Sequence, residues 1–106
     1  MNYKLIFAPS FENDIERAFE YISEKLKAPK AAKKLMADIN RKISFAEDDP
    51  YMYPLCFGQF PFLKYRKIVV KNYIVVYFIN EDEKTVNFLN LFYGGQNYVD
   101  FFNMLI

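Results

Sequence analysis

Residues 65–98 read YRKIVVKNYIVVYFINEDEKTVNFLNLFYGGQNY. Three runs of branched and aromatic residues alternate here with two short polar links, and this pattern predicts strands over 62–70, 72–80 and 84–92. The links are rich in Lys, Asn, Asp and Glu, as tight turns are. They are too short to carry the chain back for a parallel pairing, so the three strands must form an antiparallel meander.

The segment before the meander has the pattern of a strand followed by two helices. Residues 3–8 predict a short strand, and Ser10 is placed to cap the helix that follows it. Apolar residues then recur at helical spacing over 11–26 and again over 32–46, with Pro29 suited to the first turn of the second helix. Because the link between these amphipathic helices is short, we expect an antiparallel helical hairpin.

These elements predict a two-layer α+β domain. The first strand has no neighbour in sequence to pair with, so it must join the meander as an edge strand, and the two helices must cover one face of the sheet. The other face stays open. Residues 73–79 are apolar on both sides of their strand, so the open face is expected to be partly apolar and aromatic, as a partner-binding surface requires. Residues 95–105 predict a short final helix or an extended tail.

Size and composition limit the possible functions of the chain. The 106 residues suit one domain over 1–106, and the aromatic content of 20% predicts rings exposed on a contact surface. Cys56 is the only cysteine and histidine is absent, so we expect no disulfide, no metal and no cofactor, in a reducing cytoplasmic setting. No apolar run approaches the roughly 20 residues that span a bilayer, so a membrane partner is not expected.

Charge is segregated along the chain although the net charge is only +1. Residues 12–24 hold five acids against Arg17, whereas residues 25–42 hold seven basic residues against Asp38. Local patches therefore matter more than the total charge. The lysine-rich segment is interpreted either as a solvated helix face or as a docking surface for RNA or an acidic partner.

Several short motifs follow the helical hairpin. They are Tyr65-Arg66-Lys67-Ile68, Asn72-Tyr73, Val76-Tyr77, Tyr93-Gly94 and Tyr98. With the order strand, two helices, three strands, the chain resembles over nearly its whole length the RelE/ParE superfamily, the toxins of type II toxin–antitoxin systems and plasmid stabilisation proteins. The resemblance implies the RelE-like α+β fold and a cognate antitoxin as partner, with a heterotetramer as one form of that complex.

The ribonuclease branch of this superfamily cleaves mRNA on the ribosome. The first function that the resemblance implies is therefore inhibition of translation by ribosome-dependent mRNA cleavage, with ribosome and mRNA as partners. Cleavage through the RNA 2′-hydroxyl needs a base, cations for the phosphate and an acid for the leaving oxygen. Carried over by position, the resemblance implies catalytic Arg66, Tyr93 and Tyr98, and RNA-binding Lys64, Lys67 and Lys71.

Two positions depart from the ribonuclease pattern. Ile74 stands where the third strand usually carries an Arg, and Gly95 stands at a usual His or Arg position. Loss of one preorganised donor typically lowers a rate by roughly 100- to 1000-fold. The alternatives are a non-enzymatic, ParE-like inhibitor of DNA gyrase or another protein target, and a catalytically decayed module that only binds its antitoxin. Arg66 is then interpreted as a solvated or antitoxin-paired residue.

Overall fold

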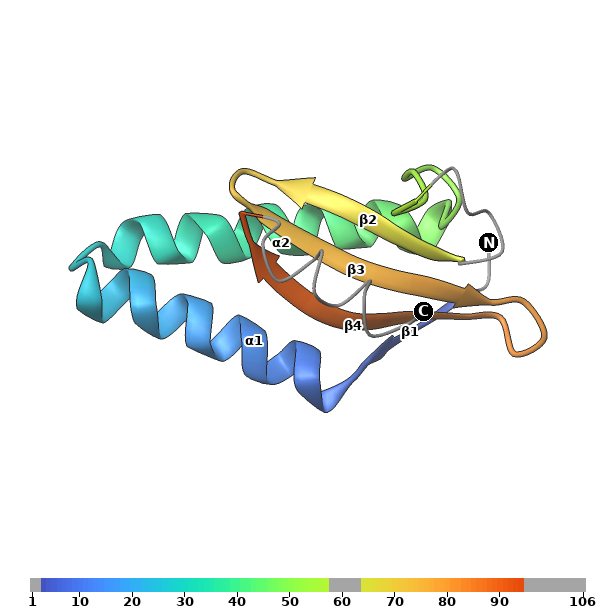
Figure 1. Ribbon diagram of the computed structural model, residues 1–106, viewed down its shortest axis with the longest axis horizontal. Coiled ribbons are helices and arrows are strands. Elements are labelled where there is room, and N and C mark those ends of the chain that lie inside the picture. Colours follow the sequence, from blue (N-terminus) through green and yellow to red (C-terminus); the bar gives the residue numbers. More distant parts are fainter. Residues whose placement is uncertain (1–2, 58–63, 95–106) are drawn as a thin grey trace.

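The chain folds as one strand, a helical hairpin and a three-stranded meander (Figure 1). The computed structural model describes residues 3–57 and 64–94, so the predicted tail at 95–105 lies outside the described residues. The elements are β1 Lys4–Phe7, α1 Pro9–Glu20, the π-helical turn η1 Tyr21–Lys25, α2 Pro29–Asp48, β2 Tyr65–Val70, β3 Tyr73–Asn80 and β4 Thr85–Tyr93.

The four strands form one mixed sheet in the order β1-β4-β3-β2. β2 pairs with β3 and β3 with β4 in antiparallel register, which confirms the predicted meander. β1 is the expected edge strand and runs parallel to β4, from Lys4 opposite Thr85 to Phe7 opposite Phe88. The parallel direction follows from the helical hairpin, which returns the chain to the same end of the sheet before the meander begins.

Both helices lie on one face of the sheet (Figure 1). α1 begins with Pro9 at its first turn, and Ala8 occupies the N-cap position without a side-chain hydrogen bond. The prediction of Ser10 as the N-cap was therefore wrong by two residues. Pro9 explains the difference, because its missing N–H and fixed φ suit the first helical position. No helix in the described ranges is long and apolar enough to cross a membrane.

The main core lies between the helices and the sheet. Val75 and Tyr77 of β3 are fully buried in one cluster with Ile39 and Ile43 of α2 and Phe88 of β4. The face of β3 that carries Tyr73, Val75, Tyr77 and Ile79 is thus the helix-covered face. The predicted alternation of β3 side chains between the two faces of the sheet is confirmed, and the structure shows which set of side chains faces the helices.

The opposite face of β3 is also apolar. Val76 is fully buried there, in a smaller cluster with Cys56. Partly buried Ile74, Phe92 and Tyr65 pack against this pair. Burial of apolar side chains on both faces explains why β3 reads as an almost continuous apolar run rather than as an alternating one.

The outer edge of β2 is protected by neighbouring segments. Residues 54–56 run antiparallel beside it: the Cys56 amide donates to the Tyr65 carbonyl at 2.7 Å, and the Lys67 amide donates to the Pro54 carbonyl at 3.1 Å. Further along, the Lys42 ammonium of α2 donates to the Val69 carbonyl at 2.8 Å. An edge occupied in this way is a poor template for another strand.

Candidate functional site

Arg66 points toward the helix side of the sheet. It alternates with Ile68 and Val70, both of which are buried in the core beneath the helices. Its guanidinium donates to the Tyr53 carbonyl at 2.7 Å and to the Tyr51 carbonyl at 3.4 Å. The same group lies 5.0 Å from the centre of the Tyr51 ring, within cation–π range. Arg66 therefore fastens β2 to the loop that follows α2.

Tyr51 extends this contact to the turn between β3 and β4. Its hydroxyl donates to the Glu81 carboxylate, which also accepts from the Tyr3 hydroxyl at 2.5 Å and the Lys84 ammonium at 2.7 Å. The bonds from Lys84, Tyr3 and Tyr51 lower the pKa of Glu81 to about 2. The bond to Glu81 raises the pKa of Tyr51 to about 12. Tyr51 therefore keeps its proton at neutral pH, and this network acts as a clamp.

The predicted RNA-binding lysines on β2 do not share the direction of Arg66. Lys67 follows Arg66 directly and so lies on the opposite face, across from Val76 of β3. Lys64 is exposed just before β2 begins. The sequence places three basic residues close together, but strand alternation sends Arg66 and Lys67 to different faces.

Tyr93 lies at the far end of the sheet from Arg66. Arg66 pairs with Tyr77 across β2 and β3, whereas Tyr93 pairs with Tyr73. Four residues of β3 therefore separate the two positions, or about 13 Å at the usual rise of a strand. The rings of Tyr73 and Tyr93 meet edge to face with their centres 5.3 Å apart. Tyr98, the third predicted catalytic residue, lies outside the described residues.

Lys71 is at the same end as Tyr93, in the turn between β2 and β3. Its backbone has φ of 55°, and its ammonium lies 3.8 Å from the Asp38 carboxylate of α2. The next turn residue, Asn72, accepts a hydrogen bond of 2.6 Å from the Gly94 amide. Gly94 has φ of 64°, so it serves a turn that other residues adopt at a cost.

A hollow of about 660 Å³ opens at this end of the molecule, between α1, the start of α2 and the end of the sheet. Three of its lining side chains are large, apolar and more than half exposed: Tyr21, Leu26 and Tyr93. Arg17 and Lys71 bring positive charge to it. The combination of exposed apolar side chains and cations is typical of a surface that binds an acidic, partly apolar partner.

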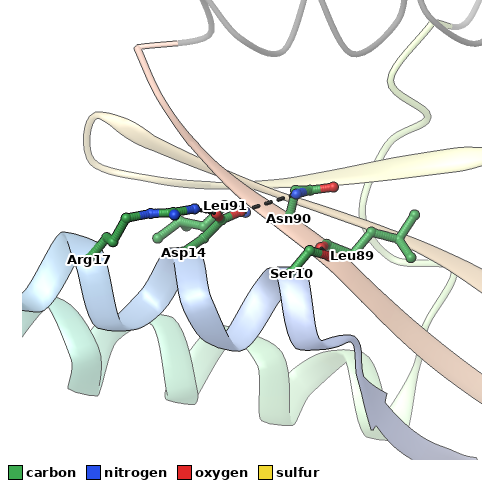
Figure 2. A network of polar contacts seen from close by, with 6 residues as sticks. All are labelled: Ser10, Asp14, Arg17, Leu89, Asn90 and Leu91. Atoms are coloured by element: carbon green, nitrogen blue, oxygen red, sulfur yellow. Dashed lines mark hydrogen bonds and ion pairs between the residues drawn. The ribbon is translucent and has the colours of Figure 1, made fainter.

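Asp14 of α1 lines this hollow and lies at the centre of a network of polar contacts (Figure 2). Its carboxylate accepts from the Leu91 amide at 3.0 Å, from the Asn90 side chain at 3.1 Å and from Arg17 at 2.7 Å. One turn earlier, the Ser10 hydroxyl donates to the Leu89 carbonyl at 2.7 Å. Side chains of α1 thus bind the backbone of β4.

The position of this network follows from the length of β1. β1 ends at Phe7 opposite Phe88, and a bulge in β4 then places Leu89 out of register with β3. Within the described ranges no strand covers the outer edge of β4 beyond that point. Ser10 and Asp14 satisfy the exposed carbonyl and amide instead. Their spacing of four residues was the available signal, but it was interpreted as helix capping and early acidic charge.

Ile74, at the usual position of an Arg, is partly buried in the smaller apolar cluster with Val76 and Cys56. Its side chain therefore contributes to apolar packing and offers no charge to a phosphate. Gly95, the other departure, lies outside the described residues. Among the residues that the structure describes, no group of three or more His, Cys, Asp or Glu side chains is placed to hold a metal ion.

Comparison with known proteins shows the family of the chain. The model of the ParE toxin of the type II toxin–antitoxin system parDE matches residues 5–98. No curated protein matches the chain in sequence.

Solved structures share the fold at low identity. A chain of the chromosomal ParDE system from P. aeruginosa has a TM-score of 0.68 at 12% identity, over 86% of this chain and 95% of that one. A chain of the RelBE2 complex from Mycobacterium tuberculosis gives 0.60 at 15%, over 88% and 99%. The isolated RelE toxin of E. coli gives 0.57 at 14%, over 99% and 100%. Because the family model spans nearly the whole chain, the protein belongs to the ParE toxin family of type II toxin–antitoxin systems.

Proposed function

We propose that this toxin acts in the cytoplasm by binding a protein target, DNA gyrase in the first place, and not by cleaving mRNA. The observation that carries the proposal is the separation of Arg66 from Tyr93 by about 13 Å along the sheet. A phosphate under attack needs its cation and its proton-transferring group within hydrogen-bond reach of the same few atoms. Arg66 on β2 and Tyr93 on β4, whose partners on β3 are four residues apart, do not meet that requirement.

The contacts of Arg66 support the same proposal. A donor that stabilises a phosphate transition state must aim at the position of the developing charge, about 2.7–3.1 Å away. The guanidinium of Arg66 already donates to two main-chain carbonyls and stacks on Tyr51. Turning it toward RNA would break these bonds and release the loop that covers the end of the core.

The partner of the toxin is proposed to be its antitoxin, bound in part at the hollow beside Tyr93. Tyr21, Leu26 and Tyr93 offer exposed apolar surface there. The lining also holds two cations, Arg17 and Lys71, against one carboxylate, Asp14. An antitoxin segment with an apolar anchor between carboxylates has the matching chemistry. The heterotetramer expected from the sequence stays a proposal. The ParDE and RelBE2 neighbours come from toxin–antitoxin systems, in keeping with such a partner.

The test is DNA supercoiling by purified gyrase in the presence of this protein. We expect inhibition that rises with toxin concentration and disappears when antitoxin is added. The Tyr93→Phe variant keeps the ring against Tyr73 and removes only the hydroxyl, so it should inhibit equally. Gyrase activity that is unaffected by the toxin at concentrations that arrest growth would refute gyrase as the target.

A further inference from the structure

A second hollow, of about 810 Å³, lies on the helical hairpin, and only residues of α1, η1 and α2 line it. Its apolar floor is formed by Ile15 and Phe19 from α1 and by Met36 from α2. The residues Ser23 and Ala37 that also line it are small. Small side chains between two helices let a third helix approach to the usual packing distance of about 8–10 Å.

The rim of this hairpin groove is acidic. Glu12, Glu16, Glu20 and Glu24 line it, and across them Lys33 is the basic residue in the lining. All four glutamates are exposed, and none makes an ion pair within 4 Å in the described parts of the chain. The lining therefore carries four negative charges against one positive charge.

This arrangement is unfavourable for the isolated helix. Like charges four residues apart on a helix repel one another, and within the described ranges no ion pair within 4 Å relieves these four. Ile15 and Met36 also pack against the main core, whereas Phe19 is not part of that cluster, so its partly exposed ring is the apolar surface that the fold does not use. The floor of Ile15, Phe19 and Met36 gives the groove a second property, which is affinity for an apolar stripe.

We propose that the hairpin groove binds a cationic amphipathic α-helix of a partner protein. Its apolar stripe would cover Ile15, Phe19 and Met36, and lysines or arginines spaced by four residues would face the glutamates. The groove shares no lining residue with the hollow beside Tyr93. One toxin can therefore hold an acidic segment at the hollow and a basic helix at the groove, and the inference does not depend on the proposed function.

The probe for the test is a labelled synthetic 18-residue amphipathic peptide with a leucine stripe flanked by lysines at a spacing of four residues. Fluorescence anisotropy with the full-length protein should show saturable binding that weakens as salt is raised. A peptide of the same pattern with every lysine replaced by glutamate is the matched probe. We expect it to bind at least tenfold more weakly.

Two variants locate the binding. Glu16→Lys combined with Glu20→Lys should weaken binding of the lysine peptide at least tenfold. Phe19→Ala should weaken its binding at high salt as well as at low salt. The control is Glu47→Lys combined with Asp48→Lys, which changes charge equally at the exposed end of α2, outside the groove, and should leave the affinity unchanged. Circular dichroism verifies the fold of each variant.

The opposite results overturn the inference. No binding of the lysine peptide would do so, as would equal binding of the glutamate peptide. An equal loss in the control variant would reduce the effect to general charge attraction. Sedimentation that shows a dimer broken by Glu16→Lys and Glu20→Lys would assign the groove to a second copy of this chain instead.

Discussion

Single side chains hold this toxin together where its backbone pairing ends. Asp14 is the main example, because one carboxylate serves the Leu91 amide, the Asn90 side chain and Arg17. Arg66 and Glu81 do the same for the loop after α2 and for the turn before β4. Polar residues that look available for chemistry in the sequence are thus engaged in supporting the fold.

Replacement of Asp14 by Ala should destabilise the protein by about 1–3 kcal/mol, because the partly buried Leu91 amide loses its acceptor. Asp14→Asn keeps an acceptor oxygen and should fall between Ala and the wild type. Urea unfolding measures the three free energies. Glu16→Ala, an exposed residue of the same helix without an ion pair, is the control and should change little. Equal losses at both positions would contradict the role given to Asp14.

The Glu81 clamp should make stability depend on acid pH. The folded-state pKa of Glu81 is about 2, below its ordinary value of 4.5. Its contribution is therefore fully present above pH 4.5 and is lost as pH falls toward 2. Glu81→Gln should lower the denaturant midpoint at pH 7 and converge with the wild type in strong acid. Glu83→Gln in the same turn is the control and should have the denaturant midpoint of the wild type at every pH. If the midpoints of Glu81→Gln and the wild type still differ in strong acid, the role given to the clamp is contradicted.

At the scale of elements, the turn between β2 and β3 carries a removable strain. Lys71 has φ of 55°, a region that costs a non-glycine residue roughly 1–2 kcal/mol. Its ion pair with Asp38 is exposed and long, so it contributes little. Lys71→Gly should therefore raise the unfolding free energy by about 1 kcal/mol, as measured by urea. Lys71→Ala keeps the strain and should bring no gain; an equal gain in both variants would locate the effect elsewhere.

The sequence predicted the elements and their pairing well because both depend on local pattern. Apolar spacing and short polar links are enough for two helices and a meander. The polar contacts were not predictable, because Ser10 and Asp14 bind a strand that lies nearly 80 residues away in sequence. The direction of Arg66 could have been inferred from its alternation with Ile68 and Val70. Both faces of β3 are apolar, however, so pattern alone did not tell which face the helices cover.

At the scale of the whole molecule, the surface is divided between two hollows of different character on different sides of α1. The hollow beside Tyr93 is aromatic with two cations and one carboxylate, and the hairpin groove is apolar with an acidic rim. Arg66 lines neither of them. Both surfaces suit the protein partners that we propose.

Antitoxin binding should accordingly depend on the hollow beside Tyr93. Leu26→Asp places a charge on an exposed apolar side chain of its lining and should weaken antitoxin binding at least tenfold. Met52→Asp makes the same change at a similarly exposed residue outside the hollow, so it should leave the affinity unchanged. Isothermal titration calorimetry measures both. Equal affinities of the two variants would place the antitoxin elsewhere.

The central claim is that this toxin acts by binding and not by cleaving RNA. Primer extension on cellular mRNA, after a short induced expression of the toxin without its antitoxin, tests it most directly. The account predicts growth arrest with mRNA that is intact within translated codons. New breaks inside those codons would contradict it and would return Arg66, Tyr93 and Tyr98 to a catalytic role.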